Sequence, residues 1–237
     1  MLDDVDLEPD VLAALPIFPL PNVVLLPGIV LPLNVFEPRY LELVDHALAN
    51  GRHVGVPLLR PGFEQGYDGK PDVEPVFGLG RLLSHHRLPD GRRFIRLEGV
   101  RRVQAIEELS PRGRFREVQC ELLPEEHPHD EMQVEVLKAQ LERISRSLAG
   151  DDQQLLNSVL TIPDPRVMVY AIAAIIPTFG CVPTNVAGRD RSPLLEVQQR
   201  CLDAPTADAR VQWLLECSAT ICEELTDSGR FPRTMLN

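Results

Sequence analysis

Residues 15–40, LPIFPLPNVVLLPGIVLPLNVFEPRY, carry the pattern that decides the fold. Six prolines stand among dense aliphatic residues, and proline marks strand edges, bulges and turns because it lacks an amide donor and has a fixed φ. The pattern predicts two short apolar strands at residues 17–20 and 29–35, joined through turns such as Pro27-Gly28. Pro38 predicts the first turn of a helix. Such a segment is typical of the rim of a small barrel.

Alternation and turn chemistry predict the rest of this first half. Residues 37–50 place apolar side chains at helical spacing, and Gly51 follows as a stop signal. Pro89-Asp90-Gly91 predicts a hairpin turn. Residues 61–75 predict a loop rich in glycine, proline and aspartate, and loops of this length often carry function. The predicted strands are residues 53–59, 76–88, 92–97, 100–106 and 115–122.

The hydrophobic period becomes helical after residue 123. Apolar residues then recur three or four apart, and Asp164 before Pro165 is placed to cap a helix. The predicted helices are residues 131–149, 152–160, 165–176, 193–202 and 208–226. The predicted fold class is therefore α+β, a small β-barrel with a packed helix followed by an α-helical subdomain. The predicted parts are an acidic tail (1–14), the barrel (15–123), an acidic linker (124–130), the helical subdomain (131–227) and a C-terminal tail (228–237).

Two blocks of the sequence also resemble a known family. Residues 15–40 resemble the opening of the amino-terminal substrate-binding domain of Lon, the ATP-dependent protease. Residues 77–108, FGLGRLLSHHRLPDGRRFIRLEGVRRVQAIEE, resemble a second block of that domain, and residues 164–177 with 194–196 resemble its helical half more weakly. The resemblance covers roughly residues 15–225 and implies a PUA-like β-barrel followed by helices. The FEPRY ending is similar to stand-alone members, cereblon and RING-type ligases.

Catalytic motifs are missing from the sequence. The two lysines, Lys70 and Lys138, lie outside any G-x-x-x-x-G-K-[ST] loop, and no G-x-S-x-G motif occurs. Because the sequence ends at residue 237, we expect neither the ATPase module nor the protease module of a full Lon protease. We therefore expect a non-catalytic protein without a cofactor. An undiscovered hydrolase is the alternative from the enzyme class.

Composition and charge narrow the location and the partners. No apolar run reaches 18 residues, which excludes a membrane span, and the first ten residues carry five acids and no base, unlike a secretory leader. Five cysteines without a C-x-x-C pair signal neither a disulfide framework nor a zinc ribbon, so a cytoplasmic location is expected. Residues 124–237 hold 10 basic against 17 acidic residues, which disfavours nucleic acid. An RNA-binding PUA-like module is the third alternative.

Two polar clusters have a plain structural interpretation beside a functional one. Residues 125–131, EEHPHDE, contain metal-ligand types, but a solvated acidic linker is favoured, so no metal site is predicted. Arginines 112, 114 and 116 would share one face of an extended strand. Arginines 92, 96, 101 and 102 would add to a basic patch, although a solvated face paired with acids is the favoured interpretation.

Five of the twelve aromatic residues lie near the predicted helix, the long loop and the next strand. Aromatic side chains mostly fill interiors, but two of these five lie in the loop, where burial is less assured. We predict peptide-binding residues among Phe36, Tyr40, Phe63, Tyr67 and Phe77. The expected function is recognition of exposed apolar segments of unfolded or flexible polypeptides, or a protein-protein interaction module, with a protease or a chaperone as a further partner. The oligomeric state stays open.

Overall fold

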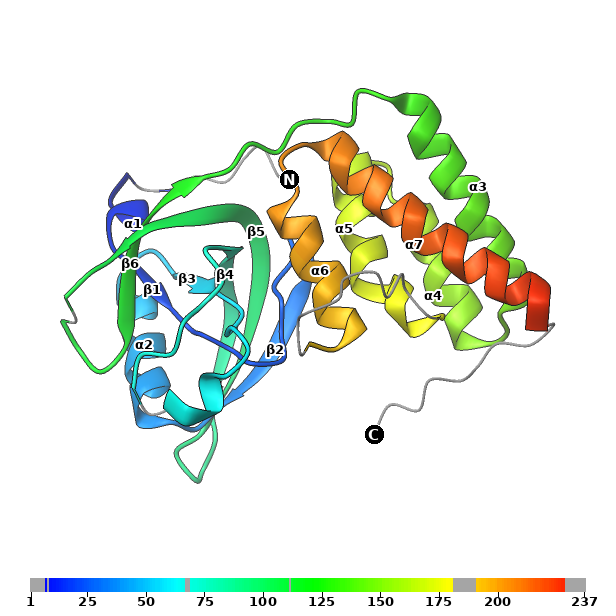
Figure 1. The fold of residues 1–237 in the computed structure, drawn as a ribbon. Coiled ribbons are helices and arrows are strands. Elements are labelled where there is room, and N and C mark those ends of the chain that lie inside the picture. The colour runs from blue at the N-terminus through cyan, green and yellow to red at the C-terminus, as the bar shows by residue number, and fades with distance from the viewer. Residues whose placement is uncertain (1–6, 8, 67–68, 111, 181–190, 229–237) are drawn as a thin grey trace. The chain divides into compact units, whose positions relative to one another are not determined.

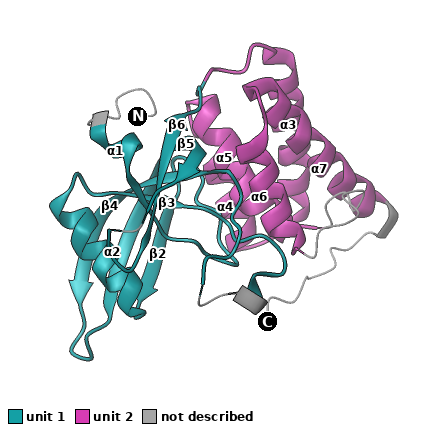
Figure 2. Cartoon of the chain, turned by 60° about the vertical axis from the view of Figure 1, so that its left-hand side comes forward, with its two compact units in different colours: residues 1–125 teal, residues 126–237 magenta. Residues whose placement is uncertain are grey.

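The computed structural model describes residues 7, 9–66, 69–110, 112–180 and 191–228. The chain divides into two units, residues 1–125 and 126–237 (Figures 1 and 2). Strands occur in the first unit, whereas the described residues of the second unit form helices and connecting turns. The predicted α+β class is therefore confirmed.

Among the described residues of the first unit, six strands form one sheet in the order β2-β5-β4-β3-β1-β6, and β6 pairs with β5 as well. The pairings of β5, β4, β3, β1 and β6 thus form a closed circuit, and β2 is attached to β5 outside it. The strands are β1 (Leu15–Ile17), β2 (Val30–Val35), β3 (His53–Val56), β4 (Val76–Arg87), β5 (Arg93–Glu108) and β6 (Arg116–Leu122).

Strand β5 is longer than the sequence predicted. We expected two strands separated at Gly99, but one strand runs through this glycine. Its first half, from Arg93 to Glu98, pairs with β2, and its second half, from Val103 to Glu108, pairs with β6. Strand β4 runs along the opposite edge, and the predicted hairpin turn joins it to β5. One strand therefore carries both β2 and β6 on the same edge.

Gly78 and Gly99 lie directly against the proline-rich connection between β1 and β2. A Cβ atom on Gly78 would lie 2.0 Å from the carbonyl oxygen of Leu25, and one on Gly99 would lie 2.1 Å from that of Leu26. The amide of Gly28 donates to the Gly99 carbonyl (2.7 Å), and the amide of Gly99 donates to the Ile29 carbonyl (2.9 Å). Glycine is needed at these two strand positions because another backbone occupies the place of a side chain.

Helix α2 (Pro38–Ala49) forms where the sequence predicted it, with Pro38 in its first turn. Its buried face packs into a core cluster with side chains from β2 to β5. Gly51 follows the end of the helix with a φ of 74°, a left-handed conformation that suits glycine. The buried residues of the helix are Tyr40, Leu43, Val44 and Ala47.

A short helix occupies part of the predicted acidic tail. Residues 9–13 form α1 (Pro9–Ala13), and Val11 and Leu12 pack against the second core cluster of the first unit. The thiol of Cys120 on β6 lies 3.7 Å from the Leu12 carbonyl oxygen, to which it donates a weak hydrogen bond. The predicted tail therefore contains a short helix, because its apolar residues pack on a surface that the local charge pattern does not reveal.

The second unit contains five α-helices and one 3₁₀ turn within its described residues, close to the predicted ranges. Helix α5 is its centre, with most of its residues buried, as its apolar run predicts. No helix in the described parts of either unit is long and apolar enough to cross a membrane. The elements are α3 (Glu131–Ser147), α4 (Asp151–Leu160), α5 (Pro165–Ile175), η2 (Ile176–Thr178), α6 (Pro193–Asp203) and α7 (Ala207–Ser228).

The predicted solvated linker contains a buried charge. Glu125 is 8% exposed, and its carboxylate accepts a hydrogen bond of 2.8 Å from Nε of Arg102, which is 1% exposed. Arg102 also donates to the Pro124 carbonyl at 2.8 Å. The interpretation of residues 124–130 as wholly solvated was therefore wrong at Glu125. The acidic composition of this stretch is typical of a solvated linker, and the sequence does not show that Glu125 neutralises the buried Arg102.

Asp164 caps helix α5, as the sequence predicted. Its side chain accepts hydrogen bonds from the amide of Arg166 (2.9 Å) and from the Arg166 guanidinium (2.8 Å). These hydrogen bonds lower the pKa of Asp164, although partial burial opposes them. We expect Asp164→Ala to lower the free energy of unfolding by about 1 to 2 kcal/mol, the usual cost of a lost cap.

The same cap predicts a pH dependence. Because the pKa of Asp164 is lowered on folding, its contribution is present above the ordinary value of 3.8 and is lost as the pH falls through the folded pKa. Urea unfolding from pH 7 downwards, followed by the fluorescence of Trp213 in the same unit, measures this. Asp164→Asn keeps a capping oxygen but cannot be ionised, so its free energy of unfolding should fall less steeply as the pH is lowered below 3.8. If the free energy of unfolding of Asp164→Asn fell as steeply with acid as that of the unaltered protein, Asp164 would not be the source of the pH dependence.

Candidate functional site

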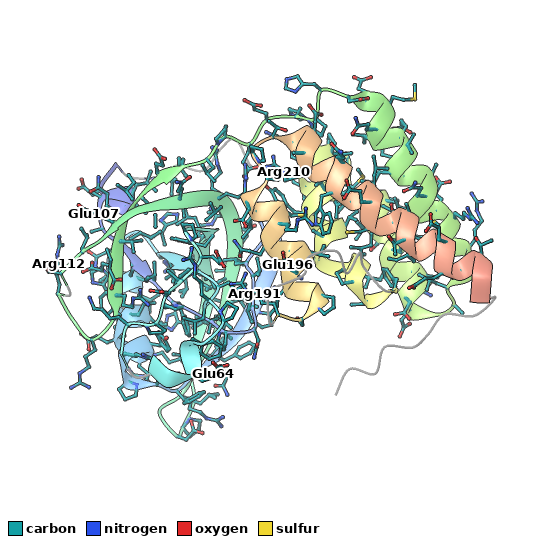
Figure 3. All side chains as sticks on the ribbon, in the orientation of Figure 1. Glu64, Glu107, Arg112, Arg191, Glu196 and Arg210 are labelled. Carbon is teal, nitrogen blue, oxygen red and sulfur yellow. The ribbon has the colours of Figure 1, made fainter. Side chains whose placement is uncertain are left out.

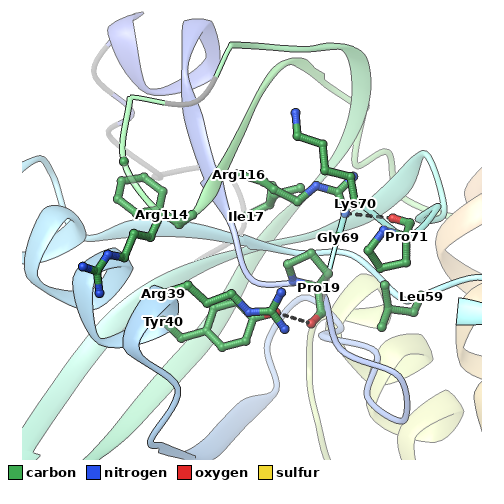
Figure 4. A pocket seen from close by; sticks show the side chains of 12 residues that line it. Ile17, Pro19, Arg39, Tyr40, Leu59, Gly69, Lys70, Pro71, Arg114 and Arg116 are labelled. Carbon is green, nitrogen blue, oxygen red and sulfur yellow. Dashed lines mark hydrogen bonds between the residues drawn. The ribbon is translucent and has the colours of Figure 1, made fainter. Parts of the chain in front are cut away.

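A surface pocket of about 290 Å³ lies in the first unit (Figure 4). Three segments that are distant in sequence surround it: the first turn of α2, the end of the loop 61–75, and the residues just before β6. The lining residues are Ile17, Pro19, Arg39, Tyr40, Leu59, Gly69, Lys70, Pro71, Gly113, Arg114, Phe115 and Arg116.

Apolar side chains and prolines form much of the pocket wall. Ile17, Leu59 and Phe115 come from the interior, where each is at most 5% exposed. The Tyr40 ring stacks on Phe18 with the ring centroids 4.0 Å apart, and its hydroxyl donates to the Pro19 carbonyl at 3.3 Å (Figure 4). The stacking and the hydrogen bond hold Tyr40 in the wall. The pocket therefore offers a rigid apolar surface.

Two cations and one acid join the end of the loop to β6. The Glu108 carboxylate is paired with Lys70 (3.1 Å) and with Arg116 (2.8 Å). Arg116 also donates to the Pro71 carbonyl at 2.8 Å (Figure 4). Partial burial raises the pKa of Glu108, but the hydrogen bonds from Arg116 and Lys70 outweigh it, and the pKa lies below its ordinary value. Glu108 therefore stays ionised and holds this side of the pocket together.

The opposite rim carries two more arginines from α2 and from the segment before β6. Arg39 pairs with Glu37 at 2.8 Å, and its guanidinium lies 4.7 Å from the centre of the Tyr40 ring. Arg114 is largely exposed and lies 3.8 Å from the Glu42 carboxylate. The rim thus has four cations against three acids, Glu37, Glu42 and Glu108. The charges of the rim nearly balance, so the apolar wall is the feature that distinguishes this pocket.

The predicted peptide-binding aromatics have different environments. Phe36 is 64% exposed, Tyr40 is 5% exposed and lines the pocket, and Phe63 is half-buried in the 3₁₀ turn η1 (Phe63–Gly66). Phe77 is 1% exposed and belongs to the second core cluster. Phe77 therefore cannot contact a peptide in this structure, and its assignment was wrong. Tyr67 lies outside the described residues.

Arg112, Arg114 and Arg116 do not form the shared face on which the less favoured interpretation, a basic patch, depended. Strand β6 begins only at Arg116, so Arg112 and Arg114 do not share a strand face with it. Arg112 (labelled in Figure 3) lies near Glu117, with 4.0 Å between Nε and Oε2. Arg114 instead lines the pocket (Figure 4). Arg102 is buried in its ion pair with Glu125. Sequence spacing could not show these separations because residues 112–115 bend before the strand starts.

Three lining residues of the pocket, Ile17, Leu59 and Phe115, were not predicted. Each has the sequence signature of an ordinary core residue, since each is apolar and stands in or beside a strand pattern. Their shared location is created by the strand pairing of β1 with β3 and β6. The only sequence signal was indirect: the long loop and the start of α2 were both singled out, and both contribute to the pocket.

Metal and thiol chemistry find little support among the described residues. These residues contain no group of three histidine, cysteine, aspartate or glutamate side chains that could hold a metal ion. His129 of the predicted linker instead donates its amide to Asp208 at 2.8 Å. The four described cysteines are free and buried, and burial raises the pKa of Cys120 to about 12. A thiol with a raised pKa is a poor nucleophile at neutral pH.

The fold of this chain is similar to that of a solved domain. The structure is similar to the N-terminal domain of the Lon protease of the Mycobacterium avium complex, with a TM-score of 0.62 and 17% identity. The superposition covers 87% of this chain and 98% of that domain. At this identity the similarity establishes the fold alone.

The family follows from the sequence comparison. The model of the ATP-dependent protease La (Lon) substrate-binding domain matches residues 14–179, and the chain belongs to this family. It is 28% identical to the Lon protease of Cytophaga hutchinsonii over 86% of this chain and 24% of that protein. It is also 28% identical to the Lon protease of Roseiflexus castenholzii over 94% of this chain and 27% of that protein. The chain thus spans about a quarter of the length of these relatives.

Proposed function

We propose that this protein recognises exposed apolar segments of polypeptides, and that the pocket between α2, the end of the loop 61–75 and β6 is the binding site. The observation that supports this most directly is the apolar wall of the pocket, which is open to the surface and held by the Tyr40 stacking and the Glu108 ion pairs. Membership of a substrate-binding family supports the same role. We further propose that the closed strand circuit is a PUA-like barrel and that the role is binding without catalysis.

The size of the pocket favours one anchoring side chain. Its volume of about 290 Å³ lies near the lower end for ligand pockets, roughly 300 Å³. Burial of one large apolar side chain contributes roughly 1.5 to 3 kcal/mol before the costs of association. Weak binding of single segments follows, and affinity would increase with additional contacts. Phe36, exposed beside the start of α2, and Phe63 in the loop are proposed as such additional contacts.

Lys70 allows the pocket to be blocked without disturbing the core. Its side chain is 54% exposed at the pocket mouth, and its partner Glu108 keeps Arg116 when the lysine is replaced. A tryptophan at position 70 would place an indole over the apolar wall. We expect Lys70→Trp to weaken binding of a fluorescently labelled, permanently unfolded model protein at least tenfold, measured by anisotropy, with an almost unchanged melting temperature.

The second lysine of the chain provides the matched control. Lys138 lies on α3 of the helical unit, where its side chain is 35% exposed and pairs with Glu135. Lys138→Trp should leave binding unchanged. A version of the labelled model protein in which the large apolar side chains are replaced by serine should not bind to the unaltered protein. The proposed site would be contradicted if Lys70→Trp and Lys138→Trp weakened binding equally. It would also be contradicted if the serine version bound as tightly as the original model protein.

A further inference from the structure

A second, polar cavity of about 410 Å³ lies on the first unit and shares no lining residue with the apolar pocket. It lies between the end of α2, the start of β3, α1 and the start of β6. Most of its wall groups are polar, which distinguishes it from the first pocket. The polar groups in its wall are Asp10, His46, Asn50, His53, Arg112 and Glu117.

Glu117 carries a buried carboxylate into this cavity. It is 1% exposed, and neither carboxylate oxygen has a hydrogen-bond partner among the described residues. On β6 its backbone is paired with that of Pro16 on β1, so the two residues share one face of the sheet, and both line the cavity. Arg112 forms a long ion pair with Glu117, with 4.0 Å between Nε and Oε2, and the Arg112 side chain is 72% exposed. A carboxylate withdrawn from water without hydrogen bonds is strongly destabilised, so it has a strong affinity for a donor.

His53 adds a second buried polar group. It is 6% exposed, and neither ring nitrogen has a partner that meets hydrogen-bond geometry in the described structure. Burial and the nearby Arg81 lower the pKa of His53, although the backbone of Gly51 acts in the opposite direction. The ring is therefore neutral at pH 7 and offers one nitrogen as an acceptor. Arg81 itself does not line the cavity and pairs with Glu98 at 2.7 Å.

The chemistry of these groups selects the ligand. An anion is disfavoured because the Glu117 carboxylate would repel it. An apolar group is disfavoured because it would leave the buried carboxylate oxygens without a hydrogen-bond donor. Glu117 and Asp10 together outnumber the one arginine in the wall. A cation with several N–H donors satisfies both the charge and the hydrogen bonds. Arg112 is exposed enough to move aside for such a cation.

We propose that this cavity binds a protonated amine of a polypeptide, with Glu117 as its counter-ion and His53 as a second hydrogen-bond acceptor. A lysine side chain and a chain N-terminus both present this group, so the two sources are separated by experiment. The site is independent of the apolar pocket, and either could fail without the other.

The test uses three small amides and the full chain labelled with ¹⁵N. N-acetyl-lysine amide presents a side-chain ammonium, alanine amide presents an α-ammonium, and N-acetyl-alanine amide presents neither. At a pH below the α-amino pKa of about 7.7 to 8.0 both amines are protonated. We expect one or both amines to produce saturable shifts of the His53 and Glu117 amide signals. The neutral amide should produce none. Equal shifts with all three compounds, or none with any, would overturn the proposal.

Two variants on the same strand sharpen the result. Glu117→Gln keeps the shape and removes the charge, and should weaken amine binding at least tenfold. Glu121→Gln, at an exposed position of β6, should leave it unchanged. Without a ligand, Glu117→Gln should also raise the melting temperature by a few degrees, because a buried carboxylate that accepts no hydrogen bond is removed. A lower melting temperature would show that the carboxylate already stabilises the free protein, and would refute the assignment.

Discussion

Replacing Gly99 with alanine is expected to destabilise the first unit by about 3 kcal/mol or more, because the added Cβ would lie 2.1 Å from the Leu26 carbonyl oxygen. That oxygen belongs to backbone and cannot move as a flexible side chain would. Moving it also disturbs the two hydrogen bonds that join Gly99 to Gly28 and Ile29, each worth about 0.5 to 1.5 kcal/mol. Amide hydrogen exchange along β5 measures the loss locally.

Gly91 provides the matched control for this substitution. It lies in the hairpin turn with a φ of 87°, and nothing lies within 4 Å of a Cβ placed there. Gly91→Ala should therefore cost only the backbone strain of a left-handed residue, about 1 to 2 kcal/mol. Equal costs at positions 91 and 99 would show that the strand has room to move away from the crossing connection. The fluorescence of Trp213 monitors the second unit in the same samples.

Removal of Arg102 is the second change with a large expected effect. Arg102→Ala leaves the Glu125 carboxylate, whose side chain is 1% exposed, without its strongest partner. Breaking a buried pair in this way costs about 3 to 5 kcal/mol. The exposed pair of Arg81 and Glu98 serves as the control, because Arg81→Ala should cost no more than about 1 kcal/mol. Urea unfolding of both variants, followed by circular dichroism, makes the comparison.

A double substitution distinguishes a buried charge from a packing defect. Arg102→Met combined with Glu125→Leu removes both charges and keeps apolar volume, and should recover most of the stability lost in Arg102→Ala. If the double variant is as unstable as the single one, the loss comes from the packing of the long arginine side chain instead. The result also determines whether the stability of the first unit depends on Glu125, which the sequence placed in a linker.

The sequence predicted the helices of the second unit and α2 to within a few residues, because their period, caps and stop signals are local. Asp164, Pro38 and Gly51 have the roles that their positions predict. Strand β5 was predicted less well. Gly99 looked like a break, since glycine weakens a strand, whereas here it admits the backbone of residues 25–29. The difference depends on a segment that lies about seventy residues earlier in the chain.

The candidate site could be predicted only in part. The sequence singled out the start of α2 and the long loop, and both line the apolar pocket. It could not show that Phe77 is core while Phe36 is exposed, since both are aromatic residues within or beside strands. It also could not show that Ile17 and Phe115 lie near each other. Their proximity results from strand pairing, which local patterns leave undetermined.

By itself, the sequence determined the α+β class, most of the helices, the hairpin and the family, because these depend on hydrophobic period, turn residues and motif spacing. Tertiary structure alone decided which charged residues are buried and which surfaces are open. Arg102 and Glu125 form a buried ion pair, and Glu117 and His53 are buried in the wall of the polar cavity. Their burial results from strands that are distant in the sequence. The physical reason is that burial and electrostatic environment are set by neighbours in space, whereas sequence patterns report neighbours along the chain.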